Sequence, residues 1–338
     1  MVTFPLLMSN ATPVQNGFLF QDCSAIVLFF DHIRDVKSFR VEGQKEDIEF
    51  ELNDGSFIYS QSKYCSKDLQ KTKAKSIFQD ALRTLSLADS EKCSGLVYTT
   101  NIILPFGPKT PSVDFGHHDY CIDYSNLSQD SKDIIDSIIE TKQLLLDRSK
   151  LSIRIIAFQE SDLQHTNSVV YQNINRFLNK LGNRFRFDEE KIMSLLMDII
   201  SYNKNNRDLS AQISKQNIIW ILIDYLMSTV DPGFDHLDPA LRYEVESKYE
   251  ELISIYVERI QYATAILYDY KEWCKNRPIT AETVQDFVTT NWEHYSSEFD
   301  SDTMDSETLK ALTIIILSKI LTLRYIIEDI KGVAGIVD

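Results

Sequence analysis

The pattern of apolar residues changes near residue 160, and this change limits the fold more than any other feature of the chain. Before it, "SFRVEG", "DIEFEL" and "SFIYSQSK" alternate as half-buried strands do, while "SGLVYTTNIIL" and "LSIRIIAFQ" are typical of buried strands. Beyond it, apolar residues recur at the 3.6-residue period of helices. The sequence therefore predicts an α/β domain at 15–160, followed by an all-α domain at 161–338.

Capping residues and breakers set the expected ends of the helices. Between the last two predicted strands, 105–133 is rich in Pro, Gly, Asp and Ser and is expected to be a loop. A single long helix is expected at 239–275, buried either against another subunit or within the chain's own core. The expected N-caps are Asp130 or Ser131 for a helix at 132–147, and Asp188, Ser214 and Ser306 further on.

The stretch "EDIEFELNDGSFIYSQSKYC" at 46–65 predicts two strands joined by a tight turn. If "NDG" forms a three-residue loop with Gly55 left-handed, Asp47 lies directly opposite Gln61, and Lys63 shares their face. Ile48 and Phe50 then belong to the opposite, core-facing side. A two-residue Asp-Gly loop also fits the sequence and would separate Asp47 from Gln61.

The three-residue loop would bring a carboxylate, an amide and an ammonium group together. Carboxylate and amide oxygens can hold a hard divalent cation such as Mg²⁺, which keeps several waters. A lysine beside them can orient water and offset charge on a phosphate, as phosphodiester hydrolysis requires. From spacing alone, a polar face turned to solvent is the simpler interpretation.

A resemblance to a known protein family favours the metal-site interpretation over the solvent-exposed polar face. "EDIEFELNDGSFIYSQSK", preceded by the predicted helix "GFLFQDCSAIVLFF", resembles the core of the PD-(D/E)xK nuclease superfamily, which has a restriction-endonuclease-like fold. More narrowly, it resembles the nuclease domain of bacterial antiphage effectors: the double-stranded-DNA endonucleases of CBASS systems and, most of all, the nuclease subunit of Lamassu-type, SMC-associated systems. Gly17, Phe20 and Gln21 match the opening helix of that family.

The resemblance implies a role for each matching residue. Asp47 would be a metal ligand, Gln61 a weaker ligand in the usual acidic position, Lys63 the catalytic lysine and Gln21 a site residue on the helix. Glu42 in "VEG" is a second candidate carboxylate. The departure from the superfamily is Gln61, because an uncharged amide binds Mg²⁺ or Mn²⁺ more weakly than a carboxylate does.

Other motifs carry less information. The segment at 62–75 is the one concentrated basic stretch. It could bind the phosphates of a DNA backbone, or it could be the solvent-exposed start of a helix. Its candidate DNA-binding residues are Lys67, Lys71, Lys73 and Lys75. "DFGHHDYC" lacks the two-plus-two spacing of a zinc site and is expected to be a polar loop. No phosphate-binding P-loop or nucleophile-elbow motif is present.

Composition limits the kind of DNA contact and the cell compartment that we expect for this protein. A formal net charge of −15 argues against a broad basic surface for nucleic acid. Five cysteines with no Cys-x-x-Cys pair suggest neither a disulfide framework nor a zinc ribbon, so a reducing cytoplasm is expected. No apolar run reaches the roughly 18 residues that span a bilayer, and no export signal is expected.

These observations lead to one main hypothesis: a metal-dependent endonuclease that cleaves double-stranded DNA within an antiphage defence complex. The resemblance implies an SMC-like ATPase and a small accessory subunit as partners, with homo-oligomerisation on activation. Two alternatives stay open, a non-catalytic adaptor with a nuclease-like fold and an RNA-directed nuclease.

Overall fold

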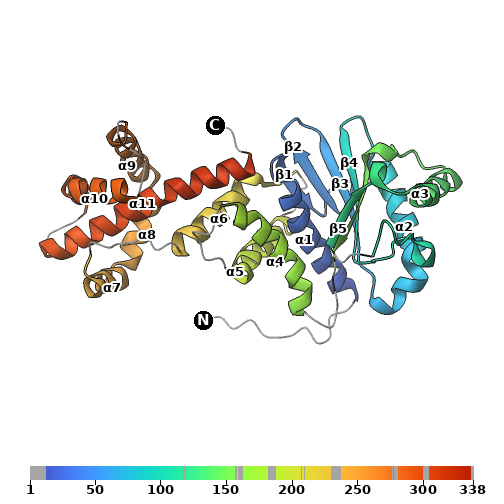
Figure 1. Cartoon of the computed structure of the whole chain (residues 1–338), viewed down its shortest axis with the longest axis horizontal. Helices are drawn as coiled ribbons and strands as arrows, with labels where there is room; N and C mark the ends of the chain where they lie inside the picture. The colour runs from blue at the N-terminus through green and yellow to red at the C-terminus, as the bar shows by residue number, and fades with distance from the viewer. Residues whose placement is uncertain are drawn as a thin grey trace. The chain divides into compact units, whose positions relative to one another are not determined.

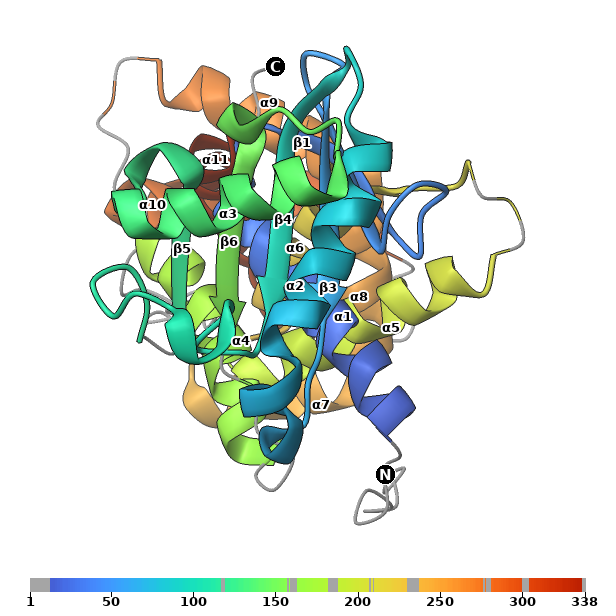
Figure 2. The same cartoon turned by 90° about the vertical axis from the view of Figure 1, so that its right-hand side faces the viewer.

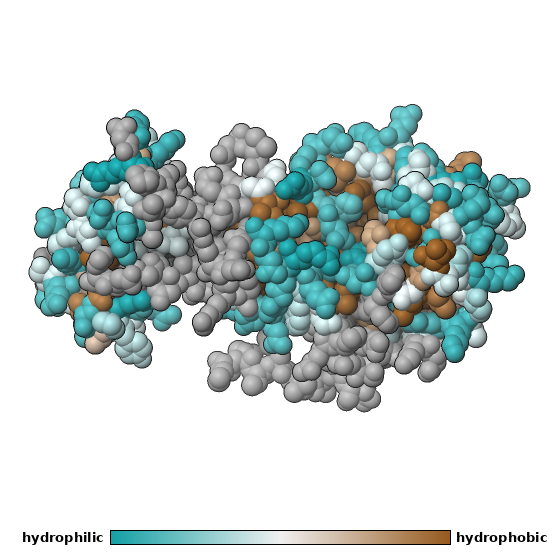
Figure 3. Space-filling view, in the orientation of Figure 1, coloured by the Kyte–Doolittle hydropathy of each residue, from teal (hydrophilic) through white to brown (hydrophobic). Residues whose placement is uncertain are grey.

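The computed structural model describes residues 13–116, 119–156, 158, 163–181, 188–206, 208, 210–229, 237–275, 277, 281–299 and 304–335. The chain forms two compact units, of which the first comprises residues up to 180 and 187–221 and the second is mainly residues 222–338. The first therefore extends well beyond residue 160, because helices that follow the sheet in sequence pack against it. Figure 3 shows apolar patches among hydrophilic residues on one face of the sheet-containing unit.

The first unit is built on a mixed seven-stranded sheet with the order β5-β6-β4-β3-β2-β1-β7 (Figure 1). Strands β3, β4 and β6 run parallel, whereas the other neighbouring pairs are antiparallel. The strands β5 and β7, at the two edges, were not expected from the sequence; β5 lies in the predicted loop. The bounds are β1 Val36–Val41, β2 Ile48–Leu52, β3 Phe57–Lys63, β4 Cys93–Thr100, β5 Asp119–Asp123, β6 Leu151–Ile156 and β7 Ile213–Ser214.

Helices cover both faces of this sheet. Helices α2 and α3 pack on one face, and Figure 2 shows them together in front of β3, β4 and β6. Helix α1 lies on the other face, where it contacts β1, β3, α4 and α5. The bounds are α1 Pro13–Asp31, α2 Lys67–Ala88, α3 Gln129–Lys142, α4 Leu163–Leu178, α5 Glu189–Lys204 and α6 Lys215–Thr229, with short 3₁₀ turns at Gly107–Lys109, Tyr124–Asn126, Arg148–Lys150 and Asn179–Leu181.

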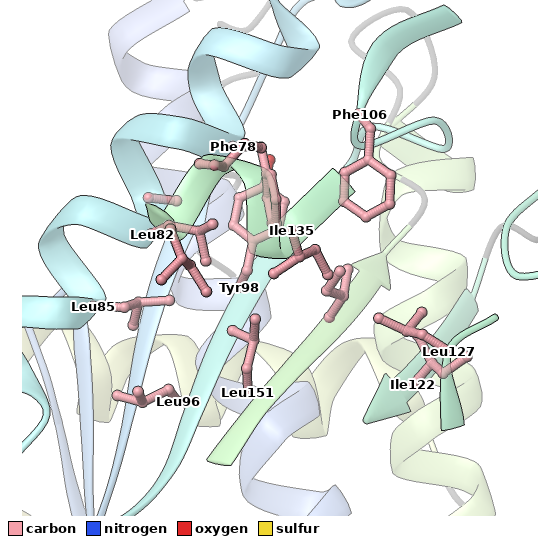
Figure 4. Close-up of a cluster of buried hydrophobic side chains, with 14 of the residues drawn as sticks. Phe78, Leu82, Leu85, Leu96, Tyr98, Phe106, Ile122, Leu127, Ile135 and Leu151 are labelled. Atoms are coloured by element: carbon pink, nitrogen blue, oxygen red, sulfur yellow. The ribbon is translucent and has the colours of Figure 1, made fainter. Parts of the chain in front are cut away.

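Each face of the sheet has its own apolar core. On the α2 side, Phe78 and Leu82 of the helix pack against Tyr98 of β4, and Ile135 of α3 closes the same cluster (Figure 4). On the α1 side, the ring of Phe39 lies 5.4 Å from that of Phe29 and 5.5 Å from that of Phe50, centroid to centroid. Alternate residues of the hairpin therefore pack on opposite faces, which places Tyr59 and Gln61 toward α2.

The second unit is helical, and α11 contacts α7, α8, α9 and α10. The bounds are α7 Pro239–Lys248, α8 Glu250–Glu258, α9 Ile260–Trp273, α10 Ala281–Ser296 and α11 Ser306–Ala334. The expected single helix at 239–275 is wrong, because the backbone leaves the helical conformation at Tyr249 and at Arg259. None of the described helices combines the length and the apolar character needed to cross a bilayer.

The N-cap residues found in the structure can be compared with those expected from the sequence. Asp188 accepts a hydrogen bond from Lys191 N and Ser214 accepts one from Asn217 N, as predicted. Two starts are shifted, one by two or three residues and the other by one. Ser128 caps α3 in place of Asp130 or Ser131, and Asp305 rather than Ser306 accepts the first backbone N–H groups of α11.

Candidate functional site

The hairpin between β2 and β3 has the register of a three-residue loop. Ile48 pairs with Ser60, and Gly55 has a φ of 82°, the left-handed conformation that such a loop needs. The Leu52 N–H donates to Ser56 O at 2.8 Å, which closes the pairing at the turn. Because this register continues by one pair beyond Ile48, Asp47 faces Gln61, as the sequence predicts.

Asp47 is the centre of a compact polar group. Its Oδ2 accepts hydrogen bonds from Gln61 Nε2 and, at 3.0 Å, from Ser62 N. Its main-chain oxygen accepts from Gln21 Nε2 at 3.0 Å and from Glu42 N at 2.7 Å. The fold thus brings together Gln21, Glu42, Asp47 and Gln61, which are spread over α1, the β1–β2 loop and the hairpin.

Gln61 is 3% exposed and has both ends of its amide engaged. Its NH₂ group donates to Asp47, while its Oε1 accepts the hydroxyl of Thr84 on α2. In this orientation the amide steadies the Asp47 carboxylate rather than presenting its oxygen beside it. That Gln61 ligates a metal therefore remains a prediction, and Thr84 is a site residue that no pattern in the sequence indicated.

Lys63 lies two residues beyond Gln61, where β3 ends beside the parallel strand β4. Its main-chain oxygen accepts the Thr100 hydroxyl at 2.9 Å, which ties the end of β3 to the end of β4. Its ammonium lies near enough to Asp47 and Glu46 to oppose the rise in pKa that burial causes in each. The site therefore occupies the carboxyl ends of parallel strands, the edge at which open α/β sheets bind ligands.

Burial dominates the electrostatics of the two adjacent carboxyl groups. Loss of solvent raises the pKa of Asp47, and Lys63 offsets only part of the rise. Burial, with the nearby Asp47, raises the pKa of Glu46 to about 8. Glu46 is 6% exposed, and among the described residues its Oε1 has no hydrogen-bond partner. A buried carboxyl oxygen without a donor has lost its hydration and gained no hydrogen bond in exchange, which disfavours the ionised form and agrees with the raised pKa.

A lysine–carboxylate group adjoins this site. Lys204 Nζ of α5 lies 3.1 Å from Asp22 Oδ1 and 3.6 Å from Glu42 Oε1. Asp22 follows Gln21 on α1, and this adjacency is the one signal that could have marked it in the sequence. Lys204, 182 residues further on, carried no such signal.

The donor set fits a divalent cation by its charge. The acidic cluster of Asp22, Glu42, Glu46 and Asp47 lies near Lys63 and Lys204. Its net charge is about −2 above the pKa of Glu46 and about −1 below it. Within the described part of the chain, however, no three His, Cys, Asp or Glu side chains gather as ligands for one metal. This arrangement suits Mg²⁺, which binds through one or two carboxylates and retains water, better than a closed zinc site.

The candidate DNA-binding lysines lie in the N-terminal half of α2, before Thr84 in the sequence. Lys71, Lys73 and Lys75 are exposed, and with a rise of 1.5 Å per residue they begin about 14 Å from Thr84 along the helix axis. Lys67 begins α2, but its side chain lies outside the described residues, as do His117 and His118 of the polar loop.

Comparison with protein-family models, curated proteins and solved structures found no match for this chain. The functional argument therefore depends on the geometry and charge of the site itself.

Proposed function

We propose that the chain is a metal-dependent endonuclease that hydrolyses phosphodiester bonds of double-stranded DNA. The observation that carries the proposal is the hairpin register, which sets Asp47 against Gln61 and places Lys63 two residues further along the same face. A restriction-endonuclease-like fold for the first unit is part of this proposal. Its support is the mixed sheet, with the site at the carboxyl end of β3.

Asp47 would hold the cation, with Glu42 or Glu46 as the second carboxylate. Both hydrogen bonds found to the Asp47 carboxylate among the described residues end on Oδ2, which leaves Oδ1 for an ion. When bound, Mg²⁺ or Mn²⁺ supplies Lewis-acid polarisation of the phosphate and activates water. Gln61 and Ser62 keep the Asp47 carboxylate oriented while this chemistry proceeds.

In this proposal, Lys63 provides electrostatic stabilisation. Its ammonium would neutralise charge that develops on the phosphate and would orient the attacking water. The exposed lysines of α2 would contact DNA phosphates on either side of the scissile bond, an interaction that weakens as salt increases. The second unit would dock partners, for which an SMC-like ATPase and a small accessory subunit are the candidates.

Cleavage of supercoiled plasmid DNA in Mg²⁺ or Mn²⁺ tests the proposal, with protein alone and with its partners. We expect Asp47→Ala and Lys63→Ala to lower the cleavage rate by at least about 100-fold, the contribution typical of such groups. Lys92→Ala is the matched control, because Lys92 is exposed and precedes β4 at the opposite end of the parallel strands. Cleavage that survives Lys63→Ala would contradict the site assignment.

A second candidate function is a non-catalytic adaptor with a nuclease-like fold. The observation that favours it is the orientation of Gln61, whose oxygen is turned to Thr84 and not to the cation position beside Asp47. An adaptor would bind the same partners in pull-down experiments and cleave neither DNA nor RNA, in Mg²⁺ or Mn²⁺, with every partner present.

A further inference from the structure

The ammonium of Lys204 lies between two carboxylates that belong to different elements of the fold. Its Nζ lies 3.1 Å and 3.3 Å from the two oxygens of Asp22 and 3.6 Å from Glu42 Oε1. The side chains of Lys204 and Asp22 are 15% and 16% exposed, so this ion pair is largely shielded from water. Shielding strengthens the attraction between the charges compared with a pair on an open surface.

The surroundings hold this arrangement in place. Lys204 Nζ also lies 5.2 Å from the centroid of the Phe18 ring, within the range of a cation–π contact. Glu42 has a φ of 55°, which is unfavourable for a residue other than glycine. The hydrogen bond from Glu42 N to Asp47 O secures that conformation and ties the loop bearing Glu42 to the candidate catalytic residue.

The charges around Lys204 remain unbalanced. A single ammonium there faces two carboxylates, those of Asp22 and Glu42. The ammonium of Lys204 therefore occupies a place where the acidic cluster attracts a cation, and it does so from the last residue of α5.

Resting on the function proposed above, we propose that Lys204 is a built-in counter-ion of the acidic cluster, which opposes the binding of an external divalent cation at Asp47 and Glu42. In the metal-free protein, the ammonium of Lys204 on α5 then neutralises part of the negative charge of the acidic cluster. Movement of α5 that withdraws Lys204 would open the acidic cluster to Mg²⁺ or Mn²⁺. Metal loading would be controlled by a helix that lies outside the stretch resembling the nuclease family.

The charge of the cluster can be changed stepwise, which gives a direct test. Removing one nearby positive charge with Lys204→Met should tighten Mn²⁺ binding by about three- to tenfold, because a divalent ion feels twice the effect of a single charge. Asp22→Asn should weaken binding by a similar factor. The double variant Lys204→Met/Asp22→Asn restores the original net charge and should bind Mn²⁺ about as wild type does.

Mn²⁺ binding would be measured on the full chain by electron paramagnetic resonance of the free ion, with folding checked by circular dichroism. Lys204→Arg preserves the charge and should leave the affinity unchanged. Lys191→Met is the matched control, because it removes an exposed lysine from the first turns of the same helix. If Lys204→Met does not fold, the double variant and Asp22→Asn still provide the comparison.

Each outcome separates this inference from the proposed function. Equal Mn²⁺ affinity in wild type and Lys204→Met, or an affinity order that does not follow the charge, overturns the inference even if plasmid cleavage occurs. Tighter binding by Lys204→Met with no cleavage by any variant supports the inference and overturns the nuclease function. If no variant binds Mn²⁺, the inference is overturned, and the plasmid cleavage assay decides the proposed function separately.

Discussion

Replacing Thr84 with valine tests the hydrogen-bond chain that orients the site. Valine keeps the shape of threonine but removes the hydroxyl that donates to Gln61 Oε1. Because Gln61 is 3% exposed, its carbonyl oxygen would be left without this donor in a buried place, which costs about 1–3 kcal/mol. For a unit of roughly 200 residues, a loss of about 2 kcal/mol lowers Tm by about 4–8 °C.

The assay is thermal unfolding of the full chain, followed by circular dichroism. Thr84→Ser is the matched control, since serine retains a hydroxyl, and it should unfold close to the wild-type temperature. A double-mutant cycle with Gln61→Leu should give a coupling free energy of about 1 kcal/mol or more, because the two side chains contact each other. If Thr84→Val is as stable as Thr84→Ser, or the coupling is absent, the inferred orientation of Gln61 is refuted.

Two further predictions concern buried charge. The pKa of Glu46 is about 8, above its usual value of 4.5, so the folded state binds the proton more tightly and loses stability as pH rises between these values. In metal-free protein, Glu46→Gln should therefore flatten the fall in Tm between pH 5 and pH 8 and raise Tm at pH 8; an unchanged slope would contradict this. Arg154→Met leaves Asp31 and Asp119 without their buried guanidinium partner and should cost roughly 3–5 kcal/mol in denaturant unfolding. The exposed pair of Lys37 and Glu51 is the comparison, where Lys37→Met should cost less than about 1 kcal/mol, and similar losses in both variants would refute the argument.

The register of the hairpin could be narrowed to two choices from the sequence, because it depends on local chemistry. Glycine adopts the left-handed conformation of a three-residue loop at little cost, and the alternation of "DIEFEL" and "SFIYSQSK" tells which residues face the core. The approach of Asp47 to Gln61 follows once the loop has three residues, and the structure decided that point. The helical conformation of α2 has a similarly local basis, since its apolar residues recur at a steady helical period.

The helical half shows where such local reasoning fails. The stretch 239–275 contains no proline after Pro239 and no glycine, so its sequence predicts one helix, yet α7, α8 and α9 are separate. All three contact α11, and packing along that one long helix is the physical reason we infer for the breaks at Tyr249 and Arg259. Helix propensity is a weak preference that tertiary contacts can override.

The sequence by itself therefore determined the order of the two architectures and limited the hairpin to two registers, one of which opposes Asp47 and Gln61 with Lys63 on their face. These depend on neighbouring residues and on the periods of strands and helices. Only the tertiary structure decided that Thr84 would hold the amide of Gln61, that Glu46 would be buried without a donor for Oε1, and that Lys204 would reach Asp22. The physical reason is that desolvation and ion pairing act between residues distant in the chain, whose separation in space no local pattern encodes.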